Sequence, residues 1–366
     1  MAESDRLEAF RPMRQGERFQ SGTPWRIRLS LTESLMNCHP VTLHDIYLAR
    51  ARLAGQAART PLVKSVALSH RFDAEVYLKL ETLQPSGAFK LRGALNAIAA
   101  LDETTLARGV TTASTGNHGR AVAWAASRLG ARAIICVSEL VPANKVAAIE
   151  ALGAEVRTVG RSQDDAFVEA RRLVKDDGMT LIEPFDDPLI VAGQGTIGLE
   201  LMEDVPGLDR VLVGLSGGGL LGGIGRAVRA INPQVQVTGV SMMNGAAMIE
   251  SLTAGHPVAV EEVETLADSL GGGIGLDNRC TWSLVREVMS DHCQVSEPAI
   301  ARAMVHFLET EKMLVEGAAV VGLAALEEHA IDIRGEKVAL IVSGSGVDMA
   351  TWQRAKAMVE KHMVDT

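Results

Sequence analysis

The sequence RVLVGLSGGGLLGGIGRAVRA, residues 210–230, joins a β-type run to a helical run through a glycine-rich turn. The run RVLVGL (210–215) is a candidate strand, and residues 220–231 have the amphipathic pattern of a helix. The turn Gly217–Gly223 is rich in glycines, which have no side chain and so let backbone N–H groups approach a ligand closely. The helix N-terminus adds unpaired donors and the positive end of a dipole, which predicts a phosphate-binding turn. The alternative is tight helix–sheet packing.

Two other motifs overlap this turn. Residues 217–222 satisfy G-x-G-x-x-G, but the acidic residue that a dinucleotide site requires about 20 positions later is absent, since Ser241 lies there. Residues 214–218 satisfy G-x-S-x-G, which makes Ser216 a candidate nucleophile of a serine hydrolase. Four histidines follow that could complete a triad: His256, His292, His306 and His329. Neither hypothesis explains the other turns described below.

Outward from this turn, short β-type runs alternate with amphipathic stretches. The strand candidates are residues 75–80, 132–137, 154–159, 179–184, 210–215, 234–240 and 337–342. The helix candidates between them are residues 118–130, 142–152, 163–178, 189–204 and 220–231. This alternation predicts an α/β fold, with a largely parallel sheet and helices on both faces.

The domain organisation follows from the same pattern. Residues 1–40 are polar and lack a strand pattern, so they form a predicted N-terminal extension. A helix is expected from Val41 onward, with Thr42 as its N-cap and Gly55 at its end. Residues 91–185 contain several complete strand–helix units, which predicts a small domain inserted into a large domain of residues 41–90 and 186–366.

Composition narrows the class of protein. The net charge of −9 argues against nucleic acid or an anionic membrane surface as the main partner. No apolar run approaches 18 residues, and the charged N-terminus has no secretory signal pattern. The cysteines show no zinc or disulfide spacing: Cys38, Cys136, Cys280 and Cys293. The sequence therefore predicts a cytoplasmic globular protein.

Four turns, each after a β-type run, are expected to share one ligand. They are SGAFK (86–90), STGNHG (114–119), SGGGLLGG (216–223) and SGSG (343–346). In a parallel α/β sheet such turns meet at the carboxyl ends of the strands, where ligands bind.

Lys90 stands at the start of the helical run KLRGALNAIAAL. A cation is disfavoured at that end of a helix, and the apolar neighbours Phe89, Leu91 and Ala94 would bury it. Both effects lower the pKa of a lysine, and a neutral amine is what a Schiff-base lysine needs. Taken by itself, a lysine at this position is expected to be a solvated surface residue, and only the neighbouring turns favour the Schiff-base role.

The other turns carry polar side chains with two possible roles each. Asn117 is either a helix N-cap or an amide donor to a ring hydroxyl of a ligand. His118 is expected to be structural rather than catalytic. Ser343 ends an apolar strand, where its hydroxyl either hydrogen-bonds a pyridine nitrogen or is an ordinary turn serine.

Together these segments resemble the fold-type II pyridoxal-phosphate enzymes, specifically the serine/threonine dehydratase and serine racemase family. The resemblance rests on LKLETLQPSGAFKLRGALNA (78–97), ASTGNHGRAVAWAA (113–126), SGGGLLGGI (216–224) and VSGSGVD (342–348). It implies a tryptophan synthase β-like fold of two doubly wound parallel-sheet lobes, with pyridoxal 5′-phosphate as the cofactor. The glycine-rich stretch 266–282 resembles a subgroup that acts on hydroxyectoine-derived or 3-hydroxyaspartate-like compounds.

The resemblance also implies residue roles. Lys90 would carry the cofactor as a Schiff base and act as the base, with Thr115 as a second catalytic group on the opposite face. The remaining cofactor contacts would be Phe89 beside the ring, Asn117 at the ring hydroxyl, Ser343 at the pyridine nitrogen, Glu316 in the pocket wall, and Gly217, Gly218, Gly219 and Leu220 at the phosphate. The substrate carboxylate would lie among Ser114, Thr115, Asn117 and His118.

The activity that the resemblance implies is a lyase reaction. A dehydratase of the ammonia-lyase type removes the β-hydroxyl of a serine-, threonine- or 3-hydroxyaspartate-like amino acid and releases a 2-oxo acid and ammonia. An amino-acid racemase on the same scaffold is the alternative. A homodimer with a small amino-acid substrate is expected. Relatives with a divalent-cation site have acidic residues where Ser241 and Ala247 stand here, so no metal is expected.

Overall fold

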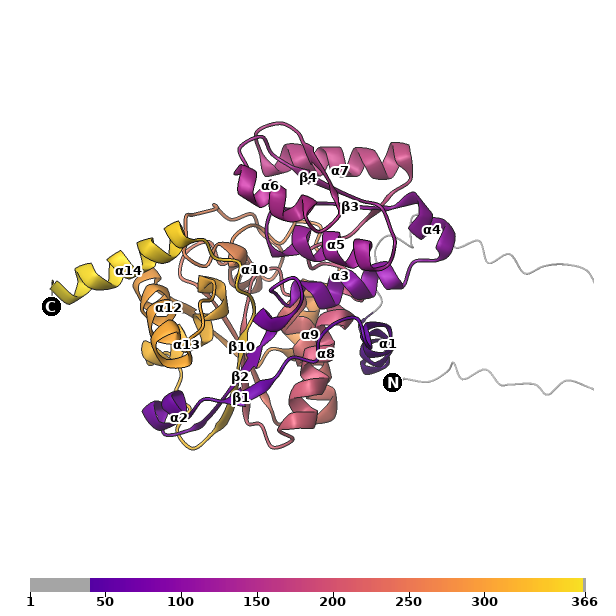
Figure 1. Ribbon diagram of the computed structural model, residues 1–366. Coiled ribbons are helices and arrows are strands. Elements are labelled where there is room, and N and C mark those ends of the chain that lie inside the picture. Colours follow the sequence, from indigo (N-terminus) through magenta and orange to yellow (C-terminus); the bar gives the residue numbers. More distant parts are fainter. Residues whose placement is uncertain (1–39, 365–366) are drawn as a thin grey trace, which may run out of the picture. The chain divides into compact units, whose positions relative to one another are not determined.

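A computed structural model describes residues 40–364 of the chain. The predicted N-terminal extension, residues 1–40, lies outside this range except for Pro40. In the part that is described, two β-sheets are accompanied by helices (Figure 1). None of the helices within residues 40–364 combines the length and the apolar character needed to cross a bilayer.

The larger sheet has six strands in the order β1-β2-β10-β7-β8-β9. All neighbours are parallel except β1 and β2, which are antiparallel. Strand β10 therefore lies inside the sheet, between β2 and β7. Figure 1 shows β10 next to β2. The strands are β1 Leu62–Lys64, β2 Glu75–Leu80, β7 Arg210–Gly214, β8 Gln236–Met242, β9 Asp291–Val295 and β10 Lys337–Val342.

The smaller sheet has four strands in the order β5-β4-β3-β6, and all of them are parallel. They are β3 Val110–Ala113, β4 Ala133–Val137, β5 Glu155–Thr158 and β6 Thr180–Leu181. Every residue of β4 is buried, as expected for a parallel strand covered on both faces. The two sheets, parallel except for the β1–β2 pair, confirm the predicted α/β fold. All four strands fall within residues 91–185, and the assignment of that range to a separate inserted domain stays a prediction.

The helices connect these strands. They are α1 Leu43–Leu53, α2 Val66–Phe72, α3 Lys90–Ala99, α4 Glu103–Arg108, α5 Asn117–Arg128, α6 Ala143–Glu150, α7 Gln163–Asp177, α8 Pro188–Asp204, α9 Gly219–Ile231, α10 Ala247–Ala254, α11 Thr281–Val288, α12 Glu297–Glu311, α13 Val321–Glu327 and α14 Met349–Val364. Three short 3₁₀ turns complete the elements: η1 Glu81–Leu83, η2 Asp268–Leu270 and η3 Gly317–Ala319.

The first helix shows why the sequence folds as it does locally. Thr42 caps α1, because its hydroxyl accepts from the Asp45 backbone N–H while the Asp45 carboxylate accepts from the Thr42 N–H. Gly55 follows the helix with a φ of 70°, a left-handed conformation that glycine adopts without strain. Both predictions for the ends of this helix are confirmed.

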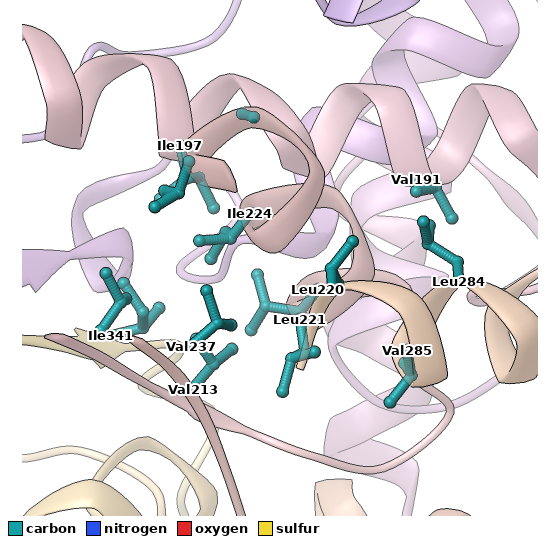
Figure 2. Packing of buried hydrophobic residues seen from close by; sticks show 14 of the residues in the cluster. Val191, Ile197, Val213, Leu220, Leu221, Ile224, Val237, Leu284, Val285 and Ile341 are labelled. Atoms are coloured by element: carbon teal, nitrogen blue, oxygen red, sulfur yellow. The ribbon is translucent and has the colours of Figure 1, made fainter. Parts of the chain in front are cut away.

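One hydrophobic core lies between the larger sheet and helices α8, α9 and α11. Figure 2 shows side chains of these helices meeting residues of β7, β8 and β10. Helix α8 is buried without interruption from Ile190 to Met202, as expected for a helix covered on all sides. Glycines allow this close packing, since a Cβ on Gly223 would lie 2.4 Å from the Val191 carbonyl oxygen. Each large aliphatic side chain buried here contributes about 1.5–3 kcal/mol.

Three further clusters fill the rest of the molecule. One packs α12 and α13 against the other face of the larger sheet, with Phe307 and Leu323 among its buried members. Another packs α3 and α5 against the smaller sheet, through residues such as Leu95 and Val122. The last places α7 on the opposite face of the smaller sheet. Helices thus cover both faces of each sheet, and the carboxyl ends of the strands are left to form a site.

Candidate active site

A cleft of about 1270 Å³ is lined by residues at the carboxyl ends of strands in both sheets. It brings together the four turns that the sequence singled out. The predicted site residues that line it are Phe89, Lys90, Ser114, Thr115, Asn117, His118, Gly217, Gly218, Gly219, Leu220, Glu316 and Ser343. Their individual roles stay predictions, whereas their arrangement around one cleft is a feature of the structure.

The lysine turn and the Ser343 turn are joined by their backbones. The N–H of Phe89 donates to the Ser343 carbonyl at 3.0 Å, and the N–H of Ser345 donates to the Gly87 carbonyl at 3.0 Å. An isolated antiparallel bridge between Ala88 and Gly344 completes the junction. The position of Lys90 relative to Ser343 is therefore set by rigid main-chain contacts rather than by flexible side chains.

Lys90 is the first residue of α3, as the sequence predicts. Its Nζ donates to the Pro184 carbonyl oxygen at 2.6 Å and lies 5.3 Å from the centre of the Phe89 ring. Burial lowers the pKa of Lys90 to about 8, and the charge of Glu316 opposes that shift. About a tenth of this amine is therefore neutral at pH 7, far more than for an ordinary lysine, which suits a nucleophile toward an aldehyde.

The glycine turn before α9 forms a cradle of backbone donors. Gly218 has a φ of 85°, and a Cβ there would lie 2.7 Å from the Met248 side chain. A Cβ on Gly217 would lie 2.4 Å from the Phe185 ring, so only glycine fits there. The first backbone bond into the helix comes from Gly222, which donates to the Gly218 carbonyl at 2.8 Å. Within residues 40–364, the N–H groups of 217–221 have no protein acceptor, so this turn fits a phosphate group.

Asn117 does not cap α5. The N-cap of that helix is Gly116, and Asn117 is its first residue. Its Nδ2 instead donates to both carboxylate oxygens of Glu316, at 3.0 and 2.8 Å. The interpretation of Asn117 as an N-cap is therefore wrong, because its side chain turns toward the cleft wall.

Glu316 collects further donors. Ser269 Oγ donates to its Oε1 at 2.8 Å, and the Gly346 N–H donates to its Oε2 at 2.9 Å. Burial raises the pKa of Glu316, while the hydrogen bonds from Asn117, Ser269 and Gly346 oppose that shift. The Gly346 N–H can only donate, so this contact favours the ionised carboxylate, which accepts.

His118 is buried, with 5% of its surface exposed. Its Nε2 lies 2.9 Å from the Ile182 carbonyl oxygen. A carbonyl can only accept, so Nε2 carries a hydrogen. Burial and the charge of Lys90 lower the pKa of His118 to about 3, so the ring is neutral near neutral pH. This environment agrees with the expected structural role.

Ser114, Thr115 and Ser343 present hydroxyl groups to the cleft. In the described part of the chain, none of these hydroxyls hydrogen-bonds another protein group. Ser343 is buried at the end of β10, with 5% of its surface exposed. All three hydroxyls are thus available to a ligand.

Residues 182–186 had no predicted role, yet this segment contacts most parts of the site. Its carbonyls accept from His118 and Lys90, and Phe185 packs against the glycine turn. The Asp186 carboxylate accepts from three successive backbone N–H groups at the start of α11. The signal was the FDDP sequence (185–188) directly after the predicted strand 179–184, a position where loops carry functional residues.

A buried cluster of charges supports the helix that carries Lys90. Arg92 donates to Glu81 at 2.8 Å and to Glu200 at 2.6 Å, while Lys79 Nζ donates to Glu200 at 2.6 Å. Lys79 also donates to the Thr60 carbonyl at 2.6 Å. Two cations and two anions balance, which is the condition for keeping such charges out of water.

Comparisons with known proteins agree with this geometry. Residues 53–344 match the family described as pyridoxal-phosphate dependent enzyme. The chain is 50% identical over 309 residues to a putative threonine dehydratase of Sinorhizobium fredii, which covers 84% of this chain and 93% of the relative. It is 41% identical over 309 residues to the L-threonine ammonia-lyase of Thermotoga maritima, covering 84% of this chain and 76% of that protein.

Solved structures show the same fold. Maize serine racemase superposes with a TM-score of 0.81 at 34% identity, covering 89% of this chain and all of that one (100%). The processed form of threonine deaminase isoform 2 from Solanum lycopersicum superposes with a TM-score of 0.79 at 29% identity, covering 88% of this chain and 96% of that one. The match over most of the chain and the cradle of free backbone donors lead to one conclusion: this chain belongs to the family of pyridoxal-phosphate dependent enzymes.

Proposed function

We propose that this protein is a dehydratase of the ammonia-lyase type, which removes the β-hydroxyl of a small hydroxy-amino acid and releases a 2-oxo acid and ammonia. The observation that carries the proposal is the position of Lys90, whose partly neutral amine shares a cleft with the glycine turn and Ser343. Relatives that span most of the chain are named threonine dehydratase and L-threonine ammonia-lyase, which supports the same reaction class.

Each residue of the cleft has its own role in the proposed reaction. Lys90 would hold the cofactor through its Nζ, and the same amine would accept the proton of the substrate Cα. The N–H groups from Gly217 to Leu220 would hold the phosphate, and Asn117 would donate to the ring hydroxyl. Pyridoxal phosphate, when bound, supplies the electron sink for the reaction. Ser343 offers a neutral hydroxyl to the pyridine nitrogen and so does not hold it protonated as an aspartate would, which favours elimination over transamination.

The substrate is held by the turn that follows β3. The free hydroxyls of Ser114 and Thr115 lie beside the N-terminus of α5, where unpaired N–H groups favour a carboxylate. His118 is neutral and bonded to Ile182, so it shapes this corner without carrying charge. The proposed substrates are serine-like and threonine-like amino acids. 3-Hydroxyaspartate belongs to the same chemical class and should be tested with them.

A racemase on the same scaffold is the second candidate. Thr115 lines the cleft with a free hydroxyl that could serve as an acid or base on the other face of the substrate. The fold match to maize serine racemase supports keeping this candidate. Chiral chromatography separates the two, because a racemase yields the opposite enantiomer whereas a dehydratase yields a 2-oxo acid.

The proposal also covers the cellular location, the oligomeric state and the domain boundaries. We place it in the cytoplasm as a homodimer, on the basis of its charge, its cysteine pattern and its family. We also propose that residues 91–185 form the small domain and residues 41–90 and 186–366 the large one.

Absorbance of the purified protein tests the proposal. The protein should show a visible band that borohydride abolishes while it fixes the cofactor covalently to the chain, and Lys90→Ala should lack this band. Lys145→Ala is the matched control, since this exposed lysine lines the same cleft. The protein should then release a 2-oxo acid from serine, threonine or 3-hydroxyaspartate isomers. A colourless protein that stays colourless with added cofactor would refute the proposal.

A further inference from the structure

The contacts of Glu316 connect segments that are far apart in the chain. Asn117 is 199 residues away and begins α5, which packs against the smaller sheet. Ser269 lies in η2, and Gly346 follows β10 of the larger sheet. One buried carboxylate therefore joins the smaller-sheet side of the cleft to two elements on the larger-sheet side.

The site is built around this carboxylate. Glu316 is 5% exposed, and no cation forms an ion pair with it in the described part of the chain. A carboxylate is costly to bury without partners, so Glu316 needs the hydrogen bonds from Asn117, Ser269 and Gly346 at the same time. The neighbouring glycines leave just enough space: a Cβ on Gly344 would lie 2.9 Å from Glu316, and one on Gly346 would lie 2.6 Å from Asn117 Oδ1.

The carboxylate also decides how the amide of Asn117 is turned. Since a carboxylate accepts and cannot donate, the amide nitrogen rather than its oxygen must face Glu316. Both Glu316 oxygens lie within 3.0 Å of this one nitrogen, an arrangement that occupies one of its two N–H groups. The second N–H remains available to a ligand in the cleft.

We propose that Glu316 is a positioning residue, which fixes the amide orientation of Asn117 and holds the start of α5 against the Ser343–Gly346 turn. Glu316 thus acts on the cofactor through Asn117 and does not bind it directly. The inference rests on the proposed contact between Asn117 and the ring hydroxyl. It differs from the role that the family resemblance implies for Glu316 as a cofactor contact.

A double-mutant cycle tests this role through cofactor binding. The variants are Glu316→Gln, Asn117→Ala and the two combined, and the readouts are the dissociation constant of pyridoxal phosphate and the absorbance spectrum of the bound cofactor. The side-chain amide of Gln can donate, so in Glu316→Gln the Asn117 amide can flip. We expect Glu316→Gln to weaken cofactor binding about tenfold and to change the spectrum, but to have little further effect once Asn117 is Ala.

Two variants serve as controls. Glu327→Gln removes another buried carboxylate, which pairs with Arg71 and His306 outside the cleft, and should leave cofactor affinity and spectrum unchanged. Glu316→Asp keeps the charge on a shorter side chain and should restore part of the affinity. If Glu316→Gln binds the cofactor normally, or if its effect adds fully to that of Asn117→Ala, the inference is wrong. Failure of the dehydratase proposal would show instead as absent 2-oxo acid release by the unaltered protein, while the binding cycle stays measurable.

Discussion

The Nζ of Lys90 donates a hydrogen bond of 2.6 Å to the carbonyl oxygen of Pro184. A proline has no backbone N–H, so at this position the neighbouring segment offers the amine an acceptor only. The amine is thus held at the cleft wall by a neutral group. An ion pair would have kept it fully protonated, whereas this contact leaves burial as the main influence on its pKa.

The pH dependence of cofactor uptake follows from that environment. The pKa of Lys90 is lowered to about 8, and only the neutral amine attacks an aldehyde. The rate at which cofactor-free protein recovers its absorbance with pyridoxal phosphate should therefore rise with pH up to about 8 and then level off. Stopped-flow absorbance measures this rate. A rate that continues to rise toward pH 10 would mean that the amine keeps an ordinary pKa.

The lowered pKa of Lys90 also determines how the free energy of unfolding changes with pH. Between about pH 8 and the ordinary pKa of 10.5, the unfolded chain holds more protons on Lys90 than the folded protein does. Stability of the cofactor-free protein should therefore increase with pH across this window, through the Lys90 contribution alone. The measurement is urea unfolding at several pH values, compared with Lys90→Met, in which this contribution is absent.

Gly218→Ala should damage the phosphate turn. The residue has a φ of 85°, and a Cβ would lie 2.7 Å from Met248 and 2.9 Å from Val285. Backbone strain and overpacking together should cost about 2–4 kcal/mol and weaken cofactor binding. Gly255→Ala is the control, because Gly255 has a similar φ of 79° with no atom within 4 Å of the new Cβ. It should lose about 1 kcal/mol of stability and keep its affinity for pyridoxal phosphate, as measured by equilibrium dialysis.

Arg92→Met should strongly destabilise the protein. The substitution leaves Glu81 and Glu200 buried with Lys79 as the remaining cation of the cluster. Removing one partner from such a cluster costs about 3–5 kcal/mol, which urea unfolding would detect. Arg334→Met removes an exposed arginine paired with Asp332 and should leave the midpoint unchanged. Equal shifts for both variants would contradict a special role for the buried cluster.

Chelation should not affect the enzyme. Ser241 and Ala247 stand where acidic ligands would be needed, and both are buried, at 1% and 4% exposure. Within residues 40–364, no group of three or more His, Cys, Asp or Glu side chains is placed to hold a metal ion. Activity after EDTA treatment should equal that of the untreated enzyme. Loss of activity that only Mg²⁺ or Ca²⁺ restores would overturn this prediction.

Of the ten strands in the described residues, the sequence predicted seven and missed β1, β3 and β9. The predicted run 337–342 matches β10 at both ends, and 210–215 matches β7 to within one residue. β9 was missed because DHCQV begins with polar residues that are exposed at the edge of the sheet. β3 was missed because VTTA is short and rich in threonine. β6, Thr180–Leu181, is shorter than the predicted run 179–184.

The sequence predicted which residues line the cleft, but it did not predict which of them contact each other. Each predicted turn carried a local signal, such as the glycines of 217–219 or the lysine at the start of α3. The Asn117–Glu316 bond had no such signal, because it joins side chains 199 positions apart and depends on the order of strands. Strand order is a long-range property, and single-sequence periodicity carries no information about it.

The central place of β10 in the larger sheet bears on how the protein is made. This strand is synthesised after β2 and β7, yet it must enter between them before the Phe89–Ser343 and Ser345–Gly87 bonds can form. The nascent polypeptide can complete its smaller sheet first, whereas its cofactor pocket must wait until β10 has been made. Deletion of β10 would thus abolish the pocket while sparing every residue from Phe89 to Glu316.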